Sequence, residues 1–479
     1  MDKYKMTIGL EIHAELNTKS KMFCSCKNSS FDKDEVAPNT NICPVCMGYP
    51  GTLPVINKEA VRKVLLVGKA VGSNLADFTE FDRKNYFYPD IPKGYQISQY
   101  KYPLISGGSI AGVELTRIHL EEDTARSSHD TGSVSLVDYN RAGVPLAELV
   151  TEPVIHSSEQ AMNFAKEYQL LLQYLNVSDA NMEKGEMRVE VNISVSKDDT
   201  FGTKVEVKNI NSFKAAGKAI DYEFKRQTSL LEEGKEVVQE TRGWDENKGS
   251  TFSQRLKESA NDYRYFPDPD LPKLMLSEVP EFSDEMLKKS LPETPKEKRE
   301  RFSKVYGIKE SDIEVYINNR EAGVFFESVA DQILSENKEL VQTASNYITS
   351  DIIGLSKTTG SYFNLGGLTD VSFSELIKMN GAGDLSSNGT KGILKIIWGG
   401  DKRTPKEIAN QEGLIQKNDI EEIKKMAQKI VDENIETANE YRNGKESLLQ
   451  FFVGQGMKES KGSVNPEVFK KIVLEILKS

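Results

Sequence analysis

The stretch Met187-Arg-Val-Glu-Val-Asn-Ile-Ser-Val195 alternates apolar and polar residues with a period of two, which predicts a β-strand with one buried face. Residues 6–14 and 203–210 repeat this alternation. Residues 195–202 lie between two of these strands and suit the loop of a hairpin. The sequence therefore predicts half-buried strands, two of them joined as a hairpin, in the N-terminal part of the chain.

Helical signals surround these strands and take over later in the chain. Helices are predicted over 58–72 and 158–175, the second with Ser157 or Ser158 as its N-cap. Near residue 292 the pattern changes: Thr294 suits an N-cap, Pro295 suits a first helical position, and helical spacing follows. A second break is Gly399-Gly-Asp-Lys-Arg-Thr-Pro405. The predicted fold class is α+β, with domains at 1–292, 293–400 and 401–479.

Composition sets limits on the class of protein. The chain has 479 residues, of which 38% are hydrophobic and 28% charged, values typical of folded globular proteins. Since no run approaches the ~18 apolar residues of a membrane span and the first residues lack an export signal, we expect a cytoplasmic protein. The net charge of −11 argues against a protein that coats nucleic acid non-specifically, but it does not exclude RNA binding.

All four cysteines of the chain lie in one short stretch, as Cys24-Ser-Cys26 and Cys43-Pro-Val-Cys46. Two close pairs of thiolates match the four ligands of a tetrahedral zinc site. Free buried thiols and disulfides are the alternatives, and a reducing cytoplasm disfavours disulfides. The sequence predicts a structural zinc site, because four protein ligands leave no open coordination position for catalysis.

Three predicted strands each carry polar residues two apart, so that their side chains share a face. The rows are Glu11 with His13, His119 with Glu121 and Asp123 (Glu122 pointing the opposite way), and Arg188 with Glu190 and Asn192. One such row is usually a solvated strand face, but three in one domain favour a shared site. Carboxylates with an occasional imidazole suit Mg²⁺ or Mn²⁺, which bridge the phosphates of ATP.

A loop rich in basic and aromatic residues spans 81–100 and contains Arg83, Lys84 and Lys93. These cations could bind phosphate or stack on bases, and the aromatics and prolines equally suit a rigid packed loop. No GxxxxGK[ST] motif and no GxGxxG after a strand occur, which argues against P-loop and Rossmann nucleotide sites.

Long motifs are spread over the whole chain. They are Gly9-Leu-Glu-Ile-His-Ala-Glu-Leu16, Asn41-Ile-Cys-Pro-Val-Cys-Met-Gly-Tyr-Pro-Gly51, Asp82-Arg-Lys-Asn-Tyr-Phe-Tyr-Pro-Asp90, Pro92-Lys-Gly-Tyr-Gln-Ile-Ser-Gln-Tyr100, Ile118-His-Leu-Glu-Glu-Asp123, Val137-Asp-Tyr-Asn-Arg-Ala-Gly-Val-Pro-Leu146, Glu240-Thr-Arg-Gly-Trp-Asp245, Asp262-Tyr-Arg-Tyr-Phe-Pro-Asp-Pro-Asp-Leu-Pro272 and Phe451-Phe-Val-Gly-Gln-Gly-Met-Lys458. Together these motifs resemble one known family, the B subunits of aspartyl/glutamyl-tRNA(Asn/Gln) amidotransferases.

The resemblance implies an N-terminal cradle domain with an antiparallel sheet, a helical domain and a small helical YqeY-like tail that binds tRNA. It implies a heterotrimer in which the A subunit is a glutamine-hydrolysing amidase and the C subunit is a small protein. ATP would phosphorylate the side-chain carboxylate of Glu-tRNA(Gln) or Asp-tRNA(Asn), and ammonia would then displace phosphate. The sequence does not distinguish between these two tRNA substrates.

The resemblance also implies roles for particular residues. The expected catalytic residues, which are also the expected Mg²⁺ ligands, are Glu11, His13, Glu121, Glu122 and Glu190. Relatives often carry Asp at the position of Glu190. The residues expected to bind ATP are Arg83, Lys84, Arg141, Arg188 and Lys208. Zinc would be structural. Two alternative functions are a catalytically silent tRNA-binding scaffold and a free-standing ligase that acts on a small amino acid.

Overall fold

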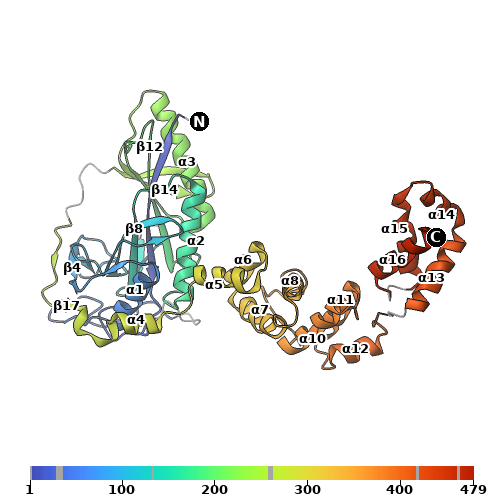
Figure 1. Ribbon diagram of the computed structural model, residues 1–479. Coiled ribbons are helices and arrows are strands. Elements are labelled where there is room, and N and C mark those ends of the chain that lie inside the picture. The colour runs from blue at the N-terminus through green and yellow to red at the C-terminus, as the bar shows by residue number, and fades with distance from the viewer. Residues whose placement is uncertain are drawn as a thin grey trace. The chain divides into compact units, whose positions relative to one another are not determined.

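The computed structural model describes residues 3–28, 36–131, 134–256, 263–416, 420–460 and 464–478. Asp262, which opens one of the motifs quoted above, lies outside these ranges. The chain forms two compact units, Met1–Pro295 and Lys296–Ser479 (Figure 1). Within the described ranges, no helix is both long enough and apolar enough to cross a membrane.

A mainly antiparallel sheet of ten strands forms the frame of the first unit. Its order is β15-β14-β13-β12-β1-β11-β8-β6-β2, with β7 paired to β8, and among the described residues only β13 and β14 run parallel. Smaller sheets pair β9 with β10, β3 with β17, and β4 with both β5 and β16. The strands are β1 Lys5–Glu15, β2 Asn74–Leu75, β3 Phe78–Thr79, β4 Asp82–Asn85, β5 Tyr95–Ser98, β6 Ile105–Ser106, β7 Ser109–Ile110, β8 Val113–Glu122, β9 Arg126–Thr131, β10 Val134–Asp138, β11 Pro145–Thr151, β12 Met187–Ser196, β13 Val205–Lys208, β14 Glu240–Asp245, β15 Ser250–Leu256, β16 Phe266–Pro267 and β17 Leu274–Met275.

Helices cover one face of this sheet. They are α1 Lys58–Ala70, α2 Ser158–Tyr174, α3 Phe213–Glu232 and α4 Asp284–Ser290, with short 3₁₀ turns η1 Leu276–Glu278 and η2 Pro280–Phe282. Figure 1 shows α2 and α3 along the same side of the sheet. The side chain of Asn57 accepts hydrogen bonds from the first turn of α1, and that of Ser157 does so for α2. The two helices predicted from the sequence, and the Ser157 cap, are therefore confirmed.

Alternation along the central strands separates an apolar face from a polar one. In β1, Ile8, Leu10 and Ile12 are buried in a core that includes residues of α1, α2 and α3. Burial of each such side chain contributes about 1.5–3 kcal/mol, and a slip of one residue would turn the whole set to the opposite face. The core thus fixes the register of the strands, and the register places Glu11 and His13 on the other face.

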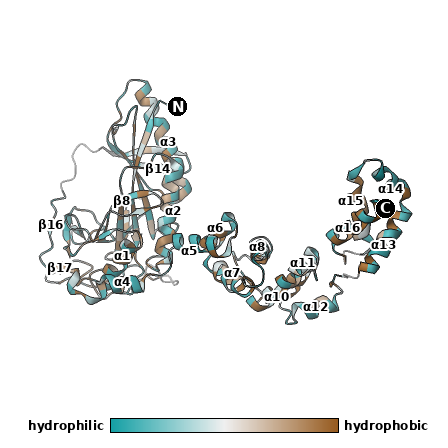
Figure 2. Ribbon diagram, in the orientation of Figure 1, coloured by the Kyte–Doolittle hydropathy of each residue, from teal (hydrophilic) through white to brown (hydrophobic). Residues whose placement is uncertain are grey.

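The second unit is helical. It comprises α5 Pro295–Arg301, η3 Phe302–Tyr306, α6 Glu310–Asn318, α7 Arg320–Ile333, α8 Lys338–Asn346, η4 Tyr347–Ile352, α9 Ile353–Thr358, α10 Asp370–Gly381, α11 Ser387–Trp398, α12 Pro405–Gln411, α13 Ile420–Glu433, α14 Ile435–Arg442, η5 Glu446–Leu448, α15 Leu449–Glu459 and α16 Pro466–Lys478, where η3 and η4 are π-helical. The last helices share a core that contains Phe452 and Phe469. Hydrophilic and hydrophobic residues interleave along α13 and α16, as expected for helices with one buried face (Figure 2). Together with the sheet of the first unit, these helices confirm the predicted α+β class.

Candidate active site and metal centres

The register of four strands brings acidic residues together on the polar face of the sheet. His13 of β1 lies opposite Glu148 of β11, which in turn lies opposite His119 of β8. On the other edge of β1, Glu11 lies opposite Glu190 of β12. Since side chains paired across neighbouring strands are about 5 Å apart, these residues form one continuous group.

His13 lies at the centre of this group. Its Nε2 atom is 3.4 Å from Glu148 Oε2, 3.5 Å from Glu121 Oε1 and 3.8 Å from Glu11 Oε1. His119 Nε2 lies 3.3 Å from the same Glu148 oxygen. One carboxylate oxygen therefore contacts two imidazoles, each of which also lies close to Glu121.

The group extends across β12 to β13. Glu11, Glu190 and Glu206 each offer a carboxylate oxygen within 4.8 Å of the others. Lys208 Nζ donates a hydrogen bond of 2.7 Å to Glu190 Oε2 and lies 3.5 Å from Glu206 Oε1, which offsets part of this negative charge. We call the whole set the carboxylate cluster: Glu11, His13, His119, Glu121, Glu148, Glu190 and Glu206.

Burial and the neighbouring charges shift the pKa values of residues in the cluster. Burial, followed by the charge of Glu148, raises the pKa of Glu11 to about 7. Burial disfavours the charged form of His13, but Glu148, Glu121 and Glu190 overcome this effect and raise the pKa of His13 to about 9. Glu148 is buried too, yet His119 and His13 hold its pKa well below its usual range. A divalent cation would replace the protons that these groups retain.

The donor set fits a hard divalent cation. The ligand atoms of Glu11, His13 and Glu148 lie within 4.8 Å of one another, and so do those of His119, Glu121 and Glu148. Carboxylate oxygens with an imidazole are suitable ligands for Mg²⁺ or Mn²⁺. On the same face, the buried Nε of Arg188 has no hydrogen-bond partner among the described residues. An anionic group bound beside the cations would satisfy this donor.

The structure places four of the five predicted Mg²⁺ ligands in the carboxylate cluster and the fifth, Glu122, elsewhere. Glu122 follows Glu121 on β8, so its side chain points to the opposite face. There it accepts hydrogen bonds from Lys93 Nζ at 2.6 Å and from the backbone N–H of Ile97 at 2.9 Å. Glu122 and Lys93 also line a pocket of about 190 Å³ with Cys46.

The predicted ATP-binding cations take different positions. Lys84 lies within electrostatic range of the cluster: the charges of Glu121 and Glu148 raise its pKa although burial opposes its charged form. Arg83 instead donates to Asp268 at 2.8 Å and to Asp270 at 3.0 Å. It is held by carboxylates of its own and does not join the cluster.

Asp123 links the other two predicted arginines. Arg188 donates a hydrogen bond to Asp123, and Arg141 Nε lies 3.5 Å from the same carboxylate. Burial opposes the charge of Asp123, but the two guanidinium groups hold its pKa below its usual range. Arg141 also donates to the carbonyl of Thr124 at 2.9 Å and thereby contacts the segment that follows β8.

Sequence reasoning missed Glu148 and Glu206 as members of the cluster, and it placed His119 in a row without giving it a ligand role. Glu148 had a signal of its own: it is a lone charge within the apolar strand Pro145-Leu-Ala-Glu-Leu-Val-Thr151. A buried carboxylate in such a strand requires partners. Glu206 gave no comparable signal, because its position beside Glu11 depends on the pairing of β12 with β13.

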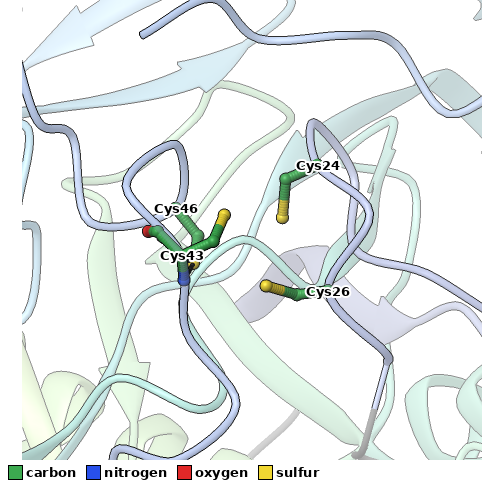
Figure 3. A group of neighbouring side chains, drawn as sticks. All are labelled: Cys24, Cys26, Cys43 and Cys46. Carbon is green, nitrogen blue, oxygen red and sulfur yellow. Dashed lines mark hydrogen bonds between the residues drawn. The ribbon is translucent and has the colours of Figure 1, made fainter.

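The four cysteines form a second candidate metal centre. Cys24 and Cys26 on one loop face Cys43 and Cys46 on another, and the four sulfurs converge (Figure 3). All four Sγ atoms lie within 4.8 Å of one another. Two facing pairs of sulfurs at this spacing fit tetrahedral zinc after small adjustments.

The surroundings favour thiolate at Cys46, whereas a hydrogen bond to Cys46 and burial raise the pKa of Cys24, and burial with a hydrogen bond to Cys43 raises that of Cys26 to about 11. A hydrogen bond from Cys24, the backbone of Cys43 and the charge of Lys21 lower the pKa of Cys46 to about 5, against the effect of burial. Lys21 is fully buried, and its Nζ atom donates to the carbonyl of Asn41 at 3.0 Å and lies 3.9 Å from Cys46 Sγ. A buried cation offsets part of the negative charge that a Cys₄ zinc site carries.

Comparisons with known proteins identify relatives of the whole chain. Residues 6–280 match a family model described as the GatB/GatE catalytic domain, and residues 325–477 match one described as the GatB domain. A protein of Thermoanaerobacter pseudethanolicus, named as the B subunit of an aspartyl/glutamyl-tRNA(Asn/Gln) amidotransferase, is 42% identical over 99% of both chains. Proteins with the same name from Caldanaerobacter subterraneus and Thermotoga maritima are 43% and 41% identical, each over 99% of both chains.

Proposed function

Since the chain belongs to the family of aspartyl/glutamyl-tRNA(Asn/Gln) amidotransferase B subunits, we propose that its carboxylate cluster is the site where ATP activates the carboxylate carried on tRNA. The enzyme of this family is a ligase that uses glutamine as amido donor. The substrate of the proposed reaction is Glu-tRNA(Gln), Asp-tRNA(Asn) or both, and the product is the corresponding amide.

One observation carries this proposal: overlapping sets of carboxylates and imidazoles lie beside a buried arginine donor without a partner among the described residues. A scaffold that only presents tRNA gains nothing from buried like charges, which cost free energy unless they hold cations. A phosphoryl-transfer site requires this arrangement, because cations and guanidinium groups neutralise the charge that develops on the phosphoryl oxygens.

The chemical need for phosphate is simple. Ammonia cannot displace an oxide from a carboxylate, so the leaving group has to be improved first. In the first step a carboxylate oxygen of the substrate attacks the γ-phosphorus of ATP, and the bond to the β-phosphate oxygen breaks to release ADP. In the second step the nitrogen of ammonia attacks the acyl carbon, phosphate leaves with the electron pair of the broken C–O bond, and the nitrogen loses a proton.

The residues of the chain have separate roles in this proposal. Glu11, His13, Glu148 and Glu190 would hold Mg²⁺, which when bound neutralises phosphate charge and orients the phosphoryl group. Arg188 would donate its Nε hydrogen to an anionic oxygen of the nucleotide or substrate. The Nη2 group of Arg188 already donates a hydrogen bond to Asp123, and this bond fixes the plane of the guanidinium.

The cysteine quartet has a structural role in this proposal. Zinc bound by Cys24, Cys26, Cys43 and Cys46 would join two loops that lie outside the named strands. The quartet also lies on the side of Glu122 and Lys93, opposite to the carboxylate cluster. Its metal would therefore shape the protein without contacting the reacting groups.

The partners of the reaction follow from the same family membership. We propose that the chain assembles in the cytoplasm with an amidase, the A subunit, which releases ammonia from glutamine, and with a small C subunit.

Within this chain, the tail at residues 401–479 is proposed to bind the body of the tRNA. A complex without residues 406–479 should bind aminoacyl-tRNA more weakly and with a flatter salt dependence, while glutamine hydrolysis persists. If the truncated complex binds aminoacyl-tRNA with unchanged affinity and unchanged salt dependence, another part of the chain recognises the tRNA.

An isotope experiment tests the activation step. Aminoacyl-tRNA whose side-chain carboxylate carries ¹⁸O is amidated by the assembled enzyme, and the released phosphate is analysed by mass spectrometry. Attack by the carboxylate on ATP predicts one ¹⁸O atom in each phosphate and ADP as the other product. Label found in AMP or in water, with none in phosphate, would contradict the proposed phosphorylation.

A further inference from the structure

One of the long motifs of the chain has no role in the proposed function. It is Glu240-Thr-Arg-Gly-Trp-Asp245, and it forms strand β14. β14 pairs in parallel with β13, and the register of the pair places Thr241 directly opposite Glu206 of the carboxylate cluster. Successive side chains of a strand point to opposite faces, so Thr241 lies on the polar face of the sheet while Glu240 and Arg242 point the other way.

Arg242 attaches β14 to the helical side of the sheet. Its Nε atom donates to Thr251 Oγ1 at 2.8 Å and lies 3.2 Å from Oε1 of Glu223 on α3. Its Nη1 group donates to Glu240. Glu223 is fully buried and also accepts hydrogen bonds of 2.9 and 2.8 Å from Arg226. Because the charges of this buried network are paired, it holds β14 rigidly for the residue on its other face.

Thr241 uses that other face to hold Glu206. Its Oγ1 atom donates a hydrogen bond of 2.7 Å to Glu206 Oε2. Thr241 is 7% exposed and the Glu206 side chain 13%, so little water competes for this bond. The other oxygen of Glu206, Oε1, lies 3.5 Å from Lys208 Nζ. One oxygen of the carboxylate therefore contacts a neutral hydroxyl, and the other lies beside an ammonium group.

These two contacts respond differently to a bound cation. Glu11, Glu190 and Glu206 can each supply one oxygen to the same divalent cation. Such a cation repels the ammonium of Lys208, which also donates to Glu190 at 2.7 Å, and weakens its hold on both carboxylates. The hydroxyl of Thr241 carries no charge and is not repelled. It is therefore the contact that keeps Glu206 in place once the cation has bound.

We propose that Thr241 is a positioning residue for the reaction, which holds Glu206 in place as a ligand of one divalent cation. Glu11 and Glu190 would supply the other carboxylates of this cation site. The inference rests on the proposed function, because it assumes that the carboxylate cluster binds cations for ATP. Hydrogen-bond partners of metal ligands typically contribute about 10–100-fold to metal affinity.

The first test removes the hydroxyl and keeps the shape of the side chain, since valine is nearly isosteric with threonine and both suit a strand. Binding of Mn²⁺ to the full-length chain in the presence of ADP is followed by the electron paramagnetic resonance signal of the free cation. Thr241→Val should weaken the binding of one Mn²⁺ by about tenfold or more. Thr241→Ser keeps the hydroxyl and should restore the affinity. Unchanged Mn²⁺ binding in Thr241→Val, or binding as weak in Thr241→Ser, would overturn the proposal.

Thr116→Val is the matched control. Thr116 on β8 also donates a hydrogen bond of 2.7 Å to a carboxylate, that of Glu152, which is not a member of the carboxylate cluster. This variant should bind Mn²⁺ as the unaltered chain does. Equal losses of Mn²⁺ affinity in Thr116→Val and Thr241→Val would overturn the specific role of Thr241. A lower melting temperature of Thr241→Val with normal Mn²⁺ binding would give Thr241 a purely structural role and would also overturn the proposal.

Kinetics of the assembled enzyme separate positioning from a general defect. Thr241→Val should raise the Mg²⁺ concentration needed for half-maximal amidation by about tenfold, and saturating Mg²⁺ should bring the rate close to that of the unaltered enzyme. Glutamine hydrolysis should be unchanged. A loss of rate that saturating Mg²⁺ does not reduce would contradict a role in holding a cation ligand.

Failure of this inference is distinguishable from failure of the proposed function. If the unaltered chain with ADP binds no Mn²⁺, the carboxylate cluster is not a cation site and the proposed function fails. If the unaltered chain binds Mn²⁺ and Thr241→Val binds it equally well, the cluster stands as proposed and only the role of Thr241 is wrongly assigned.

Discussion

The two candidate metal centres of the first unit are built in opposite ways. The carboxylate cluster lies on neighbouring strands whose backbone hydrogen bonds fix each side chain before any cation binds. The cysteine quartet lies on two loops, and its sulfurs come from residues close together in the sequence. Strands supply position at the cost of crowded charge, whereas the proposed zinc would hold the two loops together.

This difference in construction suits the carboxylate cluster to catalysis and the cysteine quartet to a structural role. A rigid site that retains protons at its carboxylates is suited to cations that arrive with a substrate and leave with its product. A closed set of four thiolates binds its metal permanently and contributes stability to the fold. Removing the first centre should abolish chemistry in a folded protein, and removing the second should loosen a protein that still has its chemistry.

The largest expected effect comes from the cluster itself. Glu11→Ala or His13→Ala should lower ATP-dependent amidation by about 10³-fold, because each removes a ligand of the proposed cations. Glutamine hydrolysis by the amidase partner should persist. Glu114→Ala is a matched control, since Glu114 lies on β8 but is exposed at its far end. Wild-type rates of tRNA-dependent ATP turnover in both cluster variants would contradict the assignment.

Neighbouring residues on β8 give the next test. Glu121→Gln should weaken binding of Mg²⁺ with ADP by about tenfold or more, because it removes charge from the cluster. Glu122→Gln should leave this binding unchanged, because Glu122 points to Lys93 on the opposite face. Calorimetry measures the binding of ADP with Mg²⁺ to both variants. Equal losses would show that Glu122 reaches the cluster, as the resemblance implies, and would contradict its position in the structure.

The cysteine quartet should respond in stability. Cys46→Ser is expected to lower zinc content and to reduce the melting temperature of the first unit by about 5–10 °C. Fluorescence of Trp244 reports on this unit when Trp398 is replaced by Phe. Ser25→Ala, an exposed change between two of the cysteines, should alter neither zinc content nor melting. Purified wild-type chain without zinc, under conditions free of chelators, would contradict the site.

The smallest expected effect concerns pH. Burial and the charge of Asp123 raise the pKa of Glu15 from 4.5 to about 8. The folded chain therefore holds a proton that the unfolded chain loses, and this contribution to stability is complete below pH 4.5 and lost as pH rises towards about 8. Glu15→Gln should flatten the pH dependence by at most about 1.4 kcal/mol per pH unit, measured by urea denaturation. An identical slope in the variant would contradict a protonated Glu15.

The two centres also differ in how far sequence alone predicts them. The cysteine quartet follows from spacing, because all four ligands lie within one short stretch. The cluster depends on which strands are neighbours, and no local pattern shows that β11 lies between β1 and β8. Glu11, His13 and Glu121 were found because each lies two residues from another polar residue on the same strand, which places both side chains on one face. Glu148 and Glu206 were missed because their partners are distant in sequence. Glu122 was expected as a ligand from the resemblance, although the alternation along β8 already turns its side chain away from Glu121.

Metal analysis of variants tests the division between the two centres most directly. The full-length wild-type chain, Glu11→Ala and Cys46→Ser are dialysed against Mn²⁺ and Zn²⁺ in the presence of ADP, and both metals are then counted by mass spectrometry. The account predicts that Glu11→Ala loses Mn²⁺ and keeps zinc, while Cys46→Ser loses zinc and keeps Mn²⁺. Loss of Mn²⁺ from folded Cys46→Ser, or of zinc from Glu11→Ala, would contradict two separate centres with separate work.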